Sequence, residues 1–270
     1  MRILTPQKDD FTIPVCPYYQ PIGNEIDIFK AAHSETVPLL LKGPTGCGKT
    51  RFVSYMAHQL NLPLVTVACH EDLTASDLIG RYLIQGDETL WSDGPMSAAV
   101  RMGAILYLDE IVEARKDTIV AIHPLTDHRR MLSIDKLAAV LEAPKSFMLV
   151  VSYNPGYQSI LKEMKPSTRQ RFVSLNFNYP GAEIEQEIIA KETNAGAEIA
   201  NKLARLAINI RNLKSRGLEE GVSTRLLVHT GRLIASGVPP RAACDVGFTY
   251  TLTEDPDLQR SIQQLVLDFF

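Results

Sequence analysis

The chain has 270 residues, a formal net charge of -3, 22% charged residues and 45% hydrophobic residues, a composition typical of soluble globular proteins. The near-neutral balance argues against a protein that acts mainly on nucleic acid, because phosphate affinity comes largely from clustered Lys and Arg. The chain has no apolar signal core near its start and no run of about 18 apolar residues, so we expect a cytoplasmic protein without a membrane span.

The first part of the chain predicts an α/β domain. Residues 1–20 are rich in Pro, Tyr and polar groups and are expected to form an extended arm, followed by a helix over residues 24–34. Five short apolar runs then occur at 37–41, 64–68, 104–108, 147–151 and 173–177. Continuous apolar runs suit strands buried on both faces of a parallel sheet. Residues 21–180 are therefore predicted to form an α/β domain with five parallel strands.

The pattern changes after residue 180. Apolar side chains recur at helical spacing in four stretches, at 184–189, 199–213, 226–234 and 258–269. This spacing is typical of amphipathic helices. Residues 181–270 are predicted to form a small all-helical domain that serves as a lid, with a hinge near residue 180.

One segment between the first apolar run and the next helix matches G-x-x-x-x-G-K-[ST], the phosphate-binding P-loop. Its sequence is Gly43-Pro44-Thr45-Gly46-Cys47-Gly48-Lys49-Thr50. The glycines let backbone N–H groups converge on the phosphates, and the start of the helix adds a favourable field. Lys49 is expected to reach the phosphate oxygens and Thr50 to ligate Mg²⁺, so the predicted ligands are ATP and Mg²⁺.

Two carboxylates follow the third apolar run, which ends at Leu108. Asp109 is predicted to hold the Mg²⁺ shell through water, and Glu110 to orient or deprotonate the attacking water. A Glu directly after the Asp indicates hydrolysis rather than nucleotide binding alone. The fourth run is followed by Asn154, whose side chain is predicted to hydrogen-bond the attacking water or the γ-phosphate.

Two arginines are candidates for contact with the γ-phosphate. Arg171, or alternatively Arg169, is placed to enter a neighbouring subunit's site as an arginine finger, which stabilises the charge of the transition state. Arg225 lies in the first turn of a predicted helix that Ser223 caps. From that turn it is expected to contact the γ-phosphate as the lid closes.

In this order, the P-loop, the Asp-Glu pair, Asn154, Arg171 and Arg225 resemble the motifs of an AAA+ ATPase along nearly the whole chain. The phrases at 77–82 and 91–96 resemble the helix-2 insert region of the MoxR branch. Further phrases are similar to the CbbQ/NorQ/NirQ group and lie at 41–53, 112–117, 123–130 and 152–158.

This resemblance implies a hexameric ring that works with a von Willebrand factor A domain protein, similar to CbbO or NorD. In this group CbbQ with CbbO reactivates inhibited Rubisco, and NorQ with NorD matures nitric oxide reductase. The phrases are shared by both types, so the alternative stays open, although we favour Rubisco as the target.

Other hypotheses remain at this point. The chain could be a nucleotide-dependent binding switch that recruits its partner without remodelling it. A DNA-dependent AAA+ protein is disfavoured because no Lys/Arg stripe with interleaved aromatics occurs. The loop predicted at 84–93, with Asp87, Glu88 and Trp91, is a candidate for lining a ring pore or its rim. A packed position is favoured for Trp91.

Overall fold

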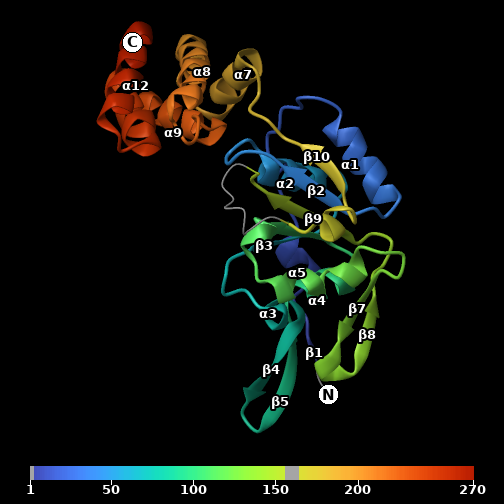
Figure 1. Ribbon diagram of the computed structural model, residues 1–270. Helices are drawn as coiled ribbons and strands as arrows, with labels where there is room; N and C mark the ends of the chain where they lie inside the picture. The colour runs from blue at the N-terminus through green and yellow to red at the C-terminus, as the bar shows by residue number, and fades with distance from the viewer. Residues whose placement is uncertain (1–2, 156–163) are drawn as a thin grey trace. The chain divides into compact units, whose positions relative to one another are not determined.

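A computed structural model of the chain describes residues 3–155 and 164–270. Contacts between residues divide the chain into two units, shown with their labelled elements in Figure 1. The first unit contains Met1–Gly43 and Lys49–Phe177. The second contains Pro44–Gly48, which is the tip of the P-loop, together with Asn178–Phe270.

The five apolar runs form a single parallel sheet in the first unit, and the predicted fold class is confirmed. The strand order is β10-β2-β9-β6-β3. Their bounds are β2 Leu39–Lys42, β3 Leu64–Ala68, β6 Ile105–Asp109, β9 Met148–Tyr153 and β10 Val173–Asn176. Every residue of β9 is buried, as expected for a strand covered on both faces. Since β2, β9 and β6 are adjacent and parallel, the segments that follow them leave the same edge of the sheet.

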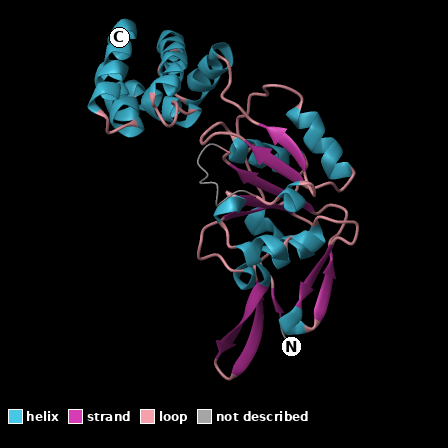
Figure 2. Cartoon of the chain, viewed as in Figure 1, coloured by secondary structure: helices cyan, strands magenta, loops and turns pink. Residues whose placement is uncertain are grey.

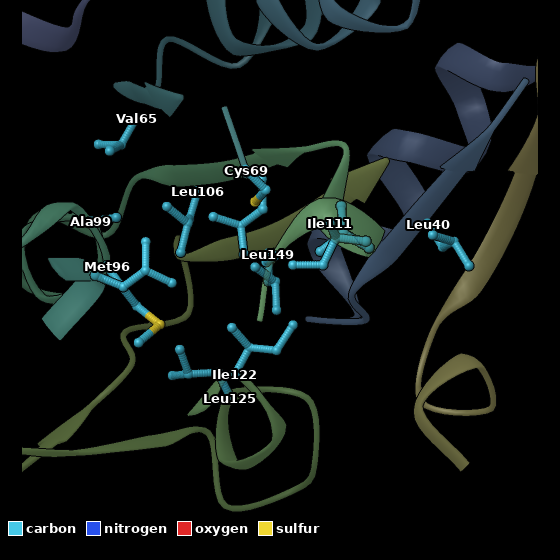
Figure 3. Close-up of a cluster of buried hydrophobic side chains, with 14 of the residues drawn as sticks. Leu40, Val65, Cys69, Met96, Ala99, Leu106, Ile111, Ile122, Leu125 and Leu149 are labelled. Carbon is cyan, nitrogen blue, oxygen red and sulfur yellow. The ribbon is translucent and has the colours of Figure 1, made fainter. Parts of the chain in front are cut away.

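Helices pack against this sheet, and the side chains between them form a hydrophobic core. The helices of the unit are α1 Glu25–Ser34, α2 Lys49–Gln59, α3 Ala75–Ile79, α4 Pro95–Met102, α5 Lys116–Ala121 and α6 Pro166–Arg169. Figure 3 shows part of the core, in which Leu106 of β6 and Leu149 of β9 belong to one cluster with Met96 of α4. Phe52 of α2 packs edge-to-face against Phe29 of α1, with ring centroids 5.5 Å apart. These contacts fix the strand ends that carry the candidate site.

Two hairpins extend the unit, as the magenta strands outside the main sheet in Figure 2 show. Strands β4 Gly80–Gln85 and β5 Glu88–Asp93 pair antiparallel, where we expected a loop at 84–93. The loop expectation was wrong, because the short turn at Gly86 lets the segments on both sides form a ladder. Trp91 is fully buried and its indole N–H donates to Asp93 at 2.8 Å.

The remaining strands of the described residues lie in the predicted arm and in a second hairpin. Within residues 1–20, β1 Ile3–Leu4 pairs parallel with β5, and a 3₁₀ turn covers Lys8–Phe11. The second hairpin consists of β7 Met131–Ile134 and β8 Ala139–Glu142.

The second unit is helical beyond the P-loop tip. Its main helices are α7 Ala182–Glu192, α8 Ala197–Arg211, α9 Thr224–Ala235, α10 Pro240–Cys244, α11 Tyr250–Leu252 and α12 Pro256–Phe269. Their apolar faces meet in one core around Leu206, Leu227 and Ile262. Ser223 caps α9 by accepting a hydrogen bond from the N–H of Leu226, as predicted. Among the described residues, no helix has the length and apolar character needed to cross a membrane.

Candidate functional site

The P-loop backbone requires glycine at its start. A Cβ added to Gly43 would lie 2.3 Å from the carbonyl oxygen of Phe177, so no larger residue fits there. Gly48 has φ +103°, a backbone conformation that L side chains rarely adopt. The loop therefore depends on glycine for both close approach and conformation, as the motif predicts.

Lys49 and Asn154, which are far apart in the sequence, meet at the edge of the sheet. The Lys49 side chain is buried, and its Nζ donates to the carbonyl oxygen of Gly43 at 2.7 Å and to Asn154 Oδ1 at 2.6 Å. Both of these acceptors are neutral oxygens, and the Lys49 ammonium lies beside the phosphate-binding loop. This arrangement suits an anion brought to the loop.

Asp109 lies at the end of β6, surrounded by hydroxyl groups. Its Oδ2 accepts from Thr50 Oγ1 at 3.3 Å, while its Oδ1 accepts from the hydroxyl of Tyr107 at 2.8 Å and from Ser152 Oγ at 2.5 Å. Thr50 and Asp109 were predicted to share a site, and the structure brings them together. Tyr107 and Ser152 were not among the predicted site residues. Tyr107 lies two residues before Asp109, and strand alternation places such residues on one face.

Glu110 adopts a strained backbone conformation beside this group. It has φ 55° and ψ 49°, in the left-handed region that residues other than glycine seldom occupy. Its N–H donates to Ser152 Oγ at 3.3 Å. Burial raises the pKa of the Glu110 carboxyl, with Lys49 opposing the rise and Asp109 adding to it. A carboxyl with a raised pKa accepts a proton from water more readily than an ordinary Glu does.

Cys69 lies near the two carboxylates, and burial together with Asp109 and Glu110 raises the pKa of its thiol to about 12. The thiol is therefore protonated at neutral pH and is unsuited to nucleophilic or metal-binding chemistry. Negative charge at this edge of the sheet thus comes from the carboxylates.

The donor set around Thr50 fits Mg²⁺. A hydroxyl and a carboxylate are hard oxygen ligands, and Mg²⁺ commonly takes one or two such protein groups together with waters and substrate phosphates. Within residues 3–155 and 164–270, no group of three or more His, Cys, Asp and Glu side chains is arranged to hold a metal. The described residues therefore offer this open oxygen site and no closed cage of those side chains.

The two finger candidates lie around the short helix α6. Arg169 is exposed, while the Arg171 side chain is 36% exposed and its guanidinium lies 3.9 Å from Asp127 Oδ2. Hydrogen bonding with Arg129 holds the pKa of Asp127 at about 2, so this carboxylate stays charged. Burial and the Arg171 charge both lower the pKa of His123. The ion-pair partner of Arg171 is thus Asp127 and not a residue of the P-loop.

Arg225 lies in the second unit, at the second residue of α9. A Cβ added to Gly46 would lie 2.7 Å from the Cβ of Ser223 and 3.2 Å from the Cβ of Arg225. The backbone of the P-loop tip therefore lies against the start of α9. The hydroxyl of Tyr179 also donates to the carbonyl oxygen of Thr45 at 3.1 Å. The last three residues of the phrase at 152–158, Gly156-Tyr157-Gln158, lie outside the described residues.

Comparison with known proteins places this geometry in a family. Residues 38–172 match the AAA domain of the dynein-related subfamily, and residues 185–269 match the CbbQ/NirQ/NorQ C-terminal domain. The chain is 53% identical to Protein CbbQ of Hydrogenophilus thermoluteolus, over 97% of this chain and 98% of that protein. The chain belongs to the CbbQ/NirQ/NorQ family of AAA ATPases.

Other members of the family are equally similar. Protein NorQ of Paracoccus denitrificans is 54% identical over 94% of each chain. The denitrification regulatory protein NirQ of Stutzerimonas stutzeri is 53% identical over 95% of this chain and 94% of that protein. Family membership confirms the predicted resemblance and the assignment as a nucleotide-binding ATPase. It does not separate the CbbQ type from the NirQ/NorQ type.

Solved structures agree on the fold. A putative ATPase from Cytophaga hutchinsonii has a TM-score of 0.52 and 18% identity, covering 92% of this chain and 90% of its own. A variant of RuvB from Thermotoga maritima has a TM-score of 0.55 and 15% identity, covering 97% of this chain and 73% of its own. At these identities the likeness shows the shared AAA fold alone.

Proposed function

We propose that this CbbQ/NirQ/NorQ-family ATPase is a motor that hydrolyses Mg-ATP to remodel a target enzyme. The observation that carries this proposal is that Lys49 and Thr50, at the start of α2, hydrogen-bond Asn154 after β9 and Asp109 at the end of the adjacent β6. A cation, a polar sensor and an acidic oxygen site are the groups that phosphoryl transfer to water requires.

Each residue has a defined task in this site. The P-loop amides and Lys49 bind the phosphates, and Thr50 with Asp109 hold Mg²⁺, which neutralises phosphate charge when bound. Glu110 orients the attacking water and takes its proton, for which its raised pKa is suited. Asn154 leaves Lys49 Nζ to hydrogen-bond the water or the γ-phosphate.

Arg171 supports a model in which chains share their active sites. Its guanidinium is partly exposed, and the ion pair with Asp127 among the described residues is long, at 3.9 Å, so little free energy opposes its transfer to a neighbouring subunit's phosphate. We propose a hexameric ring in which Arg171, or Arg169 as the alternative, completes the adjacent site. We also propose that Arg225, at the start of α9, acts as a second sensor. Residues 1–20 would form an arm, residues 21–180 the nucleotide-binding domain and residues 181–270 a lid domain.

The proposed partner is a von Willebrand factor A domain protein similar to CbbO or NorD, and the proposed target is inhibited Rubisco. Identity of 53% to CbbQ over 97% of the chain supports Rubisco as the first candidate. Identity of 54% to NorQ supports nitric oxide reductase as the second candidate.

Reactivation of sugar-phosphate-inhibited Rubisco tests the target. The purified chain with its partner and ATP is expected to restore carboxylation, and Glu110→Gln is expected to bind ATP and assemble without restoring it. Activation by Glu110→Gln would support the alternative of a binding switch. Failure with Rubisco, together with maturation of nitric oxide reductase in a strain lacking its own helper, would move the chain to the second candidate.

Arginine variants test the shared site. Arg171→Ala is expected to retain nucleotide binding and lose turnover by about 10³-fold or more, whereas Lys49→Ala loses binding itself. Arg260→Ala is the matched control, because the Arg260 side chain is 74% exposed and pairs with Asp257 of its own helix. Wild-type turnover in a double Arg169→Ala, Arg171→Ala variant would rule the shared site out.

A further inference from the structure

The two oxygens of Asp109 are used unequally. Among the described residues, Oδ1 takes two short hydrogen bonds, from Tyr107 at 2.8 Å and Ser152 at 2.5 Å, while Oδ2 takes a longer one of 3.3 Å from Thr50. Two donors on one oxygen fix the rotation of the carboxylate about its last bond. As a result, Oδ2 points toward the hydroxyl proposed to ligate the metal.

The hydroxyl groups of Tyr107 and Ser152 lie in the core, where packing alone does not explain them. Tyr107 and Ser152 are both fully buried, on the adjacent strands β6 and β9 in the middle of the sheet. A buried hydroxyl without a partner is unfavourable, and an apolar residue would suit these core positions better. Their hydroxyls are satisfied by converging on Asp109. The pair therefore has a role at the carboxylate beyond filling space.

Ser152 also connects the two acidic residues. Its Oγ donates to Asp109 Oδ1 and accepts from the N–H of Glu110 at 3.3 Å. Glu110 has left-handed backbone angles, which persist only where surrounding contacts hold them. One side chain thus fixes the direction of the metal-binding carboxylate and supports the turn that presents the base.

We propose that Tyr107 and Ser152 are positioning residues of the ATPase site, which aim Asp109 Oδ2 at the metal and, through Ser152, hold Glu110 in place. This inference rests on the Mg²⁺ site of the proposed function. The two hydroxyls differ in what they support. The Tyr107 hydroxyl bonds Asp109 and also lies 3.1 Å from Ser152 Oγ, whereas Ser152 bonds both Asp109 and the N–H of Glu110. Ser152 therefore acts directly on the metal ligand and on the base, and Tyr107 acts directly on the metal ligand.

Tyr107→Phe and Ser152→Ala test this division by titrating Mg²⁺ against the binding of a fluorescent ATP analogue. Loss of a group that orients a metal ligand commonly costs 10–100-fold in affinity, so both variants are expected to raise the half-saturating Mg²⁺ concentration by about 10-fold. Nucleotide binding without Mg²⁺ should stay unchanged. Excess Mg²⁺ is expected to restore turnover in Tyr107→Phe but not in Ser152→Ala.

Tyr153→Phe is the matched control, because it removes a hydroxyl from a buried tyrosine whose side chain belongs to the hydrophobic cluster. Asp109→Asn distinguishes failure of the positioning role from failure of the proposed Mg²⁺ site. If Asp109→Asn shifts the Mg²⁺ dependence and neither hydroxyl variant does, the positioning role is wrong. If Asp109→Asn has no effect either, the proposed Mg²⁺ site itself is wrong. Should Ser152→Ala not fold, the Tyr107→Phe titration alone decides.

Discussion

Glu185 in the helical unit and Asp109 in the α/β unit are carboxylates with opposite surroundings. Glu185 is fully buried and both of its oxygens accept from the guanidinium of Arg211, at 2.7 and 2.8 Å. Thr224 adds a third hydrogen bond at 2.7 Å. Asp109, in contrast, accepts from three neutral hydroxyls, those of Thr50, Tyr107 and Ser152.

The charge of the hydrogen-bond partners distinguishes a carboxylate that stabilises the fold from one that can bind a metal. In the Glu185–Arg211 pair the charges cancel inside the unit, and the pair joins α7 and α8 to Thr224 at the start of α9. Neutral donors fix Asp109 without cancelling its charge, so an attraction for a cation remains. An arginine in place of Tyr107 or Ser152 would hold the carboxylate as firmly and remove that attraction. Neutral partners are therefore what a metal-binding carboxylate requires.

The largest expected effect concerns the α/β unit, where Glu110 follows Asp109. Glu110→Gln removes the proposed base while keeping its shape, and general base catalysis contributes about 10²–10⁴-fold. We expect turnover to fall by that factor with ATP binding retained, as measured by single-turnover hydrolysis and nucleotide titration. Glu198→Gln, at an exposed position of α8, is the control and should hydrolyse ATP as the wild type does. Full activity of Glu110→Gln would assign the base to another residue.

Breaking the Glu185–Arg211 ion pair is expected to lower the stability of the helical unit. Arg211→Met leaves the Glu185 carboxylate buried without its partner, and breaking such a pair costs about 3–5 kcal/mol. Adding Glu185→Gln should recover most of the loss, because the buried charge is then gone. The free energy of unfolding of both variants, measured with a denaturant and a signal from the helices α7–α9, tests the loss and its recovery.

Lys202→Met is the control for this loss, since its partner Glu198 is 81% exposed and such pairs contribute less than about 1 kcal/mol. If Arg211→Met is no less stable than Lys202→Met, the Glu185–Arg211 pair contributes no more to stability than an exposed pair. The contrast drawn between Glu185 and Asp109 would then be wrong.

Sequence alone predicted the features that depend on local spacing. The five strands follow from continuous apolar runs, and the P-loop and the Asp109–Glu110 pair follow from fixed motifs. Asn154 was predicted from its place after a strand, and its contact with Lys49 at 2.6 Å follows from the adjacency of β2 and β9.

Features that depend on register or on distant pairing were not predicted. The roles of Tyr107 and Ser152 require β6 to lie beside β9, with Leu108 opposite Val151. Alternation from Asp109 back to Tyr107 was a usable signal, but nothing local marks Ser152 as its neighbour. Glu185 and Arg211 lie on different helices, and the hairpin at 80–93 depends on a turn that composition alone does not reveal.

The smallest expected effect is the pH dependence of stability at Glu110. Because burial raises its pKa, folded Glu110 binds a proton more tightly than unfolded Glu110 does. The wild type should therefore lose stability relative to Glu110→Gln as pH rises from the ordinary Glu pKa through the raised value, with no further change above it. Melting temperatures of both proteins, without nucleotide or Mg²⁺, from about pH 4 to pH 8 measure this difference. A wild type that instead gains on the variant over this range would show that the charge of Glu110 is compensated, as that of Glu185 is.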